Sequence, residues 1–179
     1  MIVGLSTSTF TSVHVALSLV GIVSGVIVLH GMVRPTRLDG WTALFLATTV
    51  LTSVTGFFFP STGFGPAHAV GILSLVVLAA AIVALYFFHL AGPWRWIYIV
   101  GAVLALYLNV FVAVVQAFQK LPPLAALAPT QSEPPFLIAQ LVVMAIFVVL
   151  GRGGEAVSRH PEQADMDAPA LDTPLMQRE

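Results

Sequence analysis

Five long apolar windows, none of which contains Asp, Glu, Lys or Arg, limit what this chain can fold into. They cover residues 10–32, 41–59, 67–90, 96–118 and 135–151. A helix of about 20 apolar residues crosses the hydrocarbon core of a bilayer, which is roughly 30 Å thick. Because that core offers the backbone no water, a helix, which pairs its own polar groups, is the structure that such a window can form. The sequence therefore predicts an all-α membrane helix bundle.

The last window is the shortest of the five. Two arrangements follow: five transmembrane helices, or four with this segment re-entrant or lying along the interface. Both place the chain in a membrane, since 58% of its residues are hydrophobic and only 8% are charged, outside the range of soluble domains. We expect residues 1–152 to form the bundle. Residues 153–179 are acidic and lack an apolar pattern, which predicts a disordered tail.

Basic residues near the ends of the windows predict the orientation, because Lys and Arg stay preferentially on the cytoplasmic side. With five spans, Lys120 lies alone on one side of the membrane. The opposite side holds five arginines: Arg34, Arg37, Arg95, Arg152 and Arg159. The sequence therefore predicts a multi-pass protein with its N-terminus outside and its C-terminus in the cytoplasm.

Several classes of function lack the residues that they need. The chain has no cysteine, which excludes disulfides, thiolate metal sites and c-type haem attachment. A net charge of -1 without a basic stripe gives no footprint for nucleic acid. No window contains a carboxylate or cation of the kind that pumps and ion-coupled transporters use. The partners that remain are the lipid bilayer and other membrane subunits.

Polar side chains from all five windows gather in the outer half of the membrane in this topology. They are His14, Thr52, Ser53, Thr55, His68, Gln116 and Gln140. Asn109 lies near mid-depth and shares a helix face with Gln116, seven positions further on. Gly21 and Gly25 lie on the same face as His14 and form a flat surface. Such a surface accepts either another helix or the ring of a macrocycle or quinone.

Two histidines make this outer-half cluster a candidate cofactor site. His14 and His68 lie at similar depth on helices predicted to be parallel, and two neutral imidazoles that face each other can serve as the axial ligands of haem b. The pattern predicts binding of haem b, a quinone or a metal ion, with both histidines as ligands or hydrogen-bond partners. Asn109, Gln116 and Gln140 would then orient the bound group.

The long connection between the fourth and fifth windows carries the most distinctive motif. Lys120, Gln131, Ser132 and Glu133 lie there, above the polar cluster, and are predicted to form a lid or a surface for a partner. From GPAHAVGILSLVVLA through WRWIYIVGAVLALYLNVFV to LAPTQSEPPF, the chain resembles a widespread group of small polytopic proteins of the bacterial inner membrane. The resemblance, of which PTQSEPP is the most specific part, implies that location and no particular activity.

Three functions therefore remain open from the sequence. The first is a redox or accessory subunit with a haem, quinone or metal in the outer half. The histidine placement is loosely similar to that of small b-type cytochromes, although their characteristic histidine contexts are missing. The second is a structural or assembly protein whose polar residues only join its helices, as interhelical hydrogen bonds do. The third is a passive permease, which the sparse polar lining of the inner half disfavours.

Overall fold

The computed structural model describes residues 2, 4–33, 38–60 and 63–166, and these form helices joined by short connections. The elements in chain order are α1 (Thr7–Val33), α2 (Asp39–Gly56), α3 (Pro66–Ile82), a π-helical turn η1 (Val83–Phe87), α4 (Trp94–Lys120), α5 (Pro122–Leu127) and α6 (Pro134–Met166). The described residues contain no strand. The predicted all-α architecture is confirmed.

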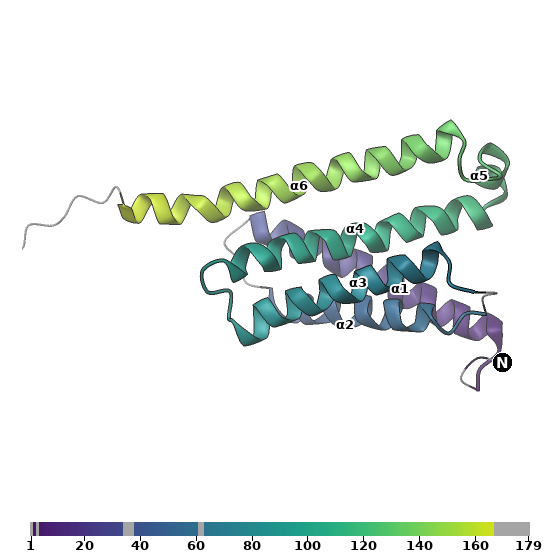
Figure 1. Cartoon of the computed structure of the whole chain (residues 1–179), viewed down its shortest axis with the longest axis horizontal. Helices are drawn as coiled ribbons and strands as arrows, with labels where there is room; N and C mark the ends of the chain where they lie inside the picture. Colours follow the sequence, from purple (N-terminus) through teal and green to yellow (C-terminus); the bar gives the residue numbers. More distant parts are fainter. Residues whose placement is uncertain (1, 3, 34–37, 61–62, 167–179) are drawn as a thin grey trace, which may run out of the picture.

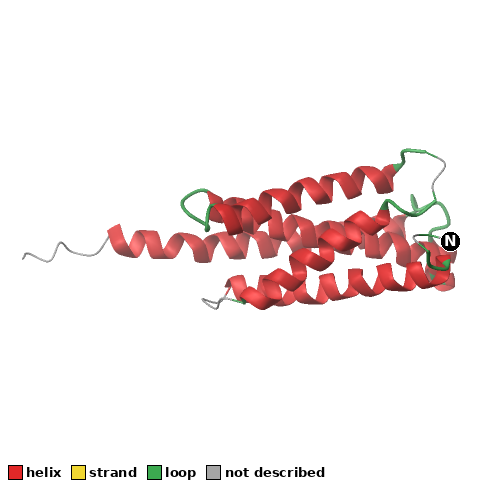
Figure 2. Cartoon of the chain, turned by 90° about the horizontal axis from the view of Figure 1, so that it is seen from below, coloured by secondary structure: helices red, strands yellow, loops and turns green. Residues whose placement is uncertain are grey.

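The long helices run along one common axis and alternate in direction (Figures 1 and 2). The N-terminus, the α2–α3 connection and α5 lie at one end of the bundle, which we call the N-terminal end, and the α3–α4 connection lies at the other (Figure 1). α4 is central and packs against α1, α3 and α6, whereas α2 packs against α1 and α3. α2 therefore lies between α1 and α3.

Four helices are long and apolar enough to cross a membrane: Thr7–Met32, Pro66–Phe87, Trp94–Lys120 and Pro134–Gly151. The chain is thus a multi-pass membrane protein. The four include residues 135–151, the window for which the sequence left open whether it crosses the membrane. The predicted second span is not among them, because α2 begins at Asp39 and ends at Gly56, before the three phenylalanines at 57–59, and includes five threonines. It nonetheless runs beside α1 and α3 (Figure 1).

The C-terminal helix extends further than the sequence pattern predicts. α6 continues to Met166, past the boundary expected at residues 152–153. The added segment, residues 152–166, contains Gly153, Gly154 and Pro161 beside a few helix-favouring Glu, Gln and Ala residues, so helix propensity alone did not predict its continuation. The last part of the predicted tail, residues 167–179, lies outside the described residues.

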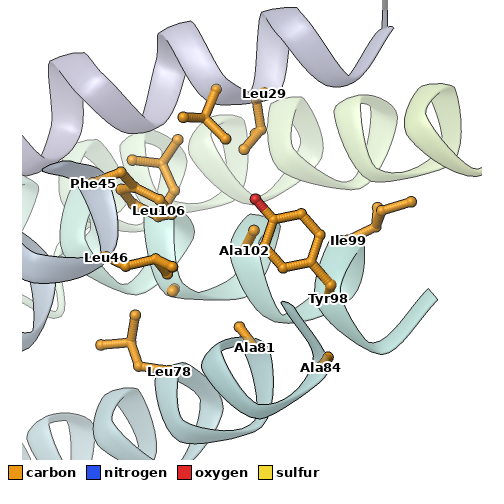
Figure 3. Packing of buried hydrophobic residues seen from close by; sticks show 12 residues of the cluster. Leu29, Phe45, Leu46, Leu78, Ala81, Ala84, Tyr98, Ile99, Ala102 and Leu106 are labelled. Carbon is orange, nitrogen blue, oxygen red and sulfur yellow. The ribbon is translucent and has the colours of Figure 1, made fainter. Parts of the chain in front are cut away.

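The hydrophobic core lies among the first four long helices (Figure 3). All twelve buried residues of its main cluster come from α1, α2, α3, η1 and α4. Phe45, Leu78 and Leu106 are completely buried there. Gly25 lets α1 approach closely, since a Cβ at this position would lie only 2.7 Å from Leu106 Cδ1 and 2.8 Å from Phe45 Cε2. α6 contributes none of the twelve and packs on this unit from outside.

Candidate functional site

A polar layer crosses the middle of the bundle where α1, α2 and α4 meet. The Ser18 hydroxyl donates to Asn109 Oδ1 at 2.9 Å. Gly21 lies one turn further on, where a Cβ would meet Asn109 Nδ2 at 3.0 Å, Thr49 Oγ1 at 3.2 Å and Thr48 Oγ1 at 3.3 Å. Of the predicted residues, the structure therefore brings Gly21 and Asn109 together. Asn109 is buried and links two helices that are far apart in the sequence.

A second polar contact joins α2 to α3. The Ser53 hydroxyl lies 3.0 Å from Ser74 Oγ and 2.9 Å from the Thr49 carbonyl. Hydroxyl groups of Ser24 and Thr48 instead donate back to their own helices, at 2.6 Å and 2.7 Å. Each of these arrangements satisfies a polar group inside the bundle, which is the usual way in which hydroxyl side chains are accommodated in membrane helices.

His14 is fixed against the end of α2. Its Nδ1 lies 2.8 Å from Thr55 Oγ1, and that hydroxyl already donates its one hydrogen to the Leu51 carbonyl at 2.7 Å. With that hydroxyl hydrogen directed at the Leu51 carbonyl, the contact is made by the tautomer of His14 that carries its hydrogen on Nδ1. The ring also packs edge-on against Phe59, with centroids 5.1 Å apart. His14 thus has a hydrogen-bond partner on α2 and an aromatic neighbour.

His68 belongs to the start of α3. Its Nδ1 accepts a hydrogen bond of 3.3 Å from the Gly65 backbone N–H, so it helps to cap the helix. The ring packs against Phe57 and stacks on Phe64, with centroids 5.7 Å apart in both pairs. These aromatic contacts hold the imidazole beside the α2–α3 connection.

The structure does not bring the two histidines together as a facing pair. α1 and α3 share no extended interface in the described chain, because α2 lies between them. His14 contacts Thr55 and Phe59, whereas His68 contacts Phe57. The predicted similarity in depth carried no information about the order of the helices around the bundle. A haem held between these two imidazoles is therefore not supported.

The other predicted site residues are dispersed. Gly25 packs against Phe45 and Leu106 rather than facing an open groove. Gln116 is exposed on α4. Gln140 Nε2 donates to the Phe111 carbonyl at 3.3 Å, and its buried Oε1 has no hydrogen-bond partner among the described residues. These side chains do not converge on one bound group.

The loop between α5 (Pro122–Leu127) and α6 has an internal hydrogen-bond network centred on Glu133. The carboxylate accepts from the Thr130 backbone N–H at 3.1 Å, the Thr130 hydroxyl at 2.9 Å and the Ser132 backbone N–H at 3.1 Å. Desolvation acts to raise the pKa of Glu133, but these hydrogen bonds outweigh it and hold the pKa below its ordinary value. Phe118 packs edge-on against Phe136 beneath the loop, with centroids 5.4 Å apart. The motif PTQSEPP therefore builds a preformed turn.

Acid is expected to loosen this turn. A carboxyl group whose pKa is lower in the folded chain stabilises the fold at pH values above its pKa in the unfolded chain. This contribution to stability is lost as the pH falls through the lower pKa of the folded chain. Protection of the Thr130 and Ser132 amides from hydrogen exchange, corrected for the intrinsic exchange rate, should fall over that interval. Glu133→Gln should show the lower protection at neutral pH, whereas Lys120→Gln should behave like the unmodified protein. Unchanged protection in Glu133→Gln would contradict the assigned network.

Sequence reasoning missed four members of the polar contacts: Ser18, Thr48, Thr49 and Ser74. Ser18 was recognisable, since it lies between His14 and Gly21 at helical spacing and so shares their face. The five threonines of α2 fall within about 140° of its circumference, so this clustering on one side of the helix was a signal that sequence reasoning did not use. Within the described residues, no group of three or more His, Asp or Glu side chains is placed to hold a metal ion.

Comparison of the chain with protein-family models, with curated proteins and with solved structures found no match.

Proposed function

We propose that the chain is a non-catalytic structural or assembly subunit of a bacterial inner membrane. The observation that supports this proposal best is that polar side chains of different helices form hydrogen bonds with one another: Ser18 with Asn109, His14 with Thr55, and Ser53 with Ser74. Such bonds contribute about 0.6 to 2 kcal/mol each. A bundle joined in this way presents a rigid surface to a partner, whereas a cofactor site needs polar groups that remain directed at the bound molecule.

The partner surface of this proposal is the outer loop around Lys120, Gln131, Ser132 and Glu133. Its turn is preformed by hydrogen bonds to Glu133, and Gln131 has a positive φ of 60°. A loop that is ordered before binding loses little conformational entropy when a partner docks. We place this loop outside the cell, with the α3–α4 connection in the cytoplasm. Trp41 and Trp96, 43% and 54% exposed, support a membrane interface at the latter end.

A visible absorption spectrum of the detergent-purified protein tests the non-catalytic assignment. We expect no Soret band and no bound metal or quinone. His14→Ala should lower the free energy of unfolding by about 1 kcal/mol, the value of one interhelical hydrogen bond, without any spectral change. His68→Ala is the matched control: it removes the second imidazole and should likewise leave the absorption spectrum unchanged. A Soret band that disappears in His14→Ala would replace this proposal with a haem protein.

Single-cysteine labelling tests the orientation cleanly, because the chain has no cysteine of its own. In spheroplasts, an impermeant maleimide should label Ser132→Cys in the outer loop. It should label Ala91→Cys, at the opposite end of the bundle, only after permeabilisation. The reverse pattern would show that the N-terminus lies in the cytoplasm.

A further inference from the structure

An apolar groove of about 330 Å³ runs along the outside of the bundle between α4 and α6. Ile99, Val103 and Tyr107 line one wall, and Met144, Phe147 and Gly151 line the other. Both walls lie within helices that are able to cross the membrane. The groove therefore opens toward lipid, and hydrocarbon chains are the solvent that surrounds it.

The groove matches one leaflet in length and position. From Ile99 to Tyr107 the α4 wall rises by about 12 Å at 1.5 Å per residue, close to the roughly 15 Å that one half of the hydrocarbon core occupies. The end of the groove nearest the headgroups lies near the start of α4, where the exposed Trp96 indicates the headgroup level. An acyl chain entering from that leaflet would lie along the groove.

A positive charge stands at the end of this groove. Arg95 is exposed and lies four residues before Ile99, so it occupies the same face of α4 one turn closer to the headgroups. Side chains on a helix lean toward its N-terminus, which directs the guanidinium away from the hydrocarbon. A guanidinium in this place complements a phosphate group.

We infer that this groove binds an acyl chain of an anionic glycerophospholipid, whose phosphate is held by Arg95. The apolar walls supply contact with the chain, and the arginine selects the headgroup. The inference is independent of the proposed function, because it concerns a different face of the bundle from the outer loop.

Native mass spectrometry of the delipidated full-length protein tests this inference by titration with phosphatidylglycerol or phosphatidylcholine. We expect one retained phosphatidylglycerol per chain and about fivefold weaker retention of phosphatidylcholine, the effect of one basic side chain at an anionic surface. Arg95→Gln should abolish the preference, whereas Lys120→Gln, at the other end of the bundle, should preserve it.

A second variant tests the groove itself. Gly151→Leu places a side chain in it and favours helix, so the fold should persist by circular dichroism while retention of both lipids falls. Val149→Leu is the matched control, because Val149 is 69% exposed and lies outside the groove. Equal retention of the two lipids by the unmodified protein, or unchanged retention in Gly151→Leu, would overturn the inference. A dimer that forms in place of the lipid complex would overturn it as well.

Discussion

Gly25→Val is expected to lower the free energy of unfolding by about 3 kcal/mol, the upper part of the usual range for overpacking a core. A Cβ at this position would lie 2.7 Å from Leu106 Cδ1 and 2.8 to 2.9 Å from two ring atoms of Phe45. Both neighbours are completely buried, so neither can move into open space. The expected result is separation of α1 from α2 and α4.

Unfolding by SDS in mixed micelles measures this effect. Gly40→Val is the control, since a Cβ at Gly40 would meet nothing within 4 Å, and it should change stability by less than about 0.5 kcal/mol. Combining Gly25→Val with Phe45→Leu should restore part of the loss, because the smaller side chain frees volume next to the new valine. If Gly25→Val is as stable as the unmodified protein, the helix packing described for this junction is wrong.

Asn109→Asp is expected to destabilise the protein by about 3 kcal/mol at neutral pH, as a carboxylate near the middle of a transmembrane helix does. The two side chains have nearly the same shape, so the change isolates the charge. Asn109 is buried among Ser18, Thr48 and Thr49, and none of these can neutralise a carboxylate. Acidification should recover stability, because protonation removes the charge.

Asn109→Ala separates the charge from the hydrogen bond. It removes the bond to Ser18 and should cost about 1 to 2 kcal/mol at every pH. The comparison is made by following thermal unfolding of both variants in detergent as the pH is lowered. A pH-independent loss of stability in Asn109→Asp, equal to that in Asn109→Ala, would show that water reaches this layer and solvates the carboxylate.

Composition was enough to predict the helical class and four of the membrane spans, because uninterrupted apolar windows have few other stable structures. The bounds of α2 were less accessible, because that helix begins at Asp39 and ends at Gly56 and so excludes the phenylalanines that made the window apolar. Position along the axis of each helix follows from counting residues. The order of helices around the bundle does not, and for this reason the prediction paired His14 with His68 although α1 and α3 share no extended interface among the described residues.

The face shared by His14, Gly21 and Gly25 was predicted correctly in one respect and misassigned in another. Helical spacing placed the three residues together, since that depends only on local geometry. What fills the space beside each glycine depends on residues far away in the sequence: Asn109 at Gly21, and Phe45 with Leu106 at Gly25. A single sequence carries no signal for such long-range neighbours.

Every buried residue of the main core cluster comes from α1, α2, α3, η1 or α4. This distribution affects the order in which the protein can assemble during biosynthesis. Translation delivers α6 after these elements, so the ribosome has already supplied all parts of that cluster when α4 is inserted. The nascent chain can then consolidate before α6 leaves the translocon. α6 then packs onto a unit in which every buried residue of the main core cluster is already present.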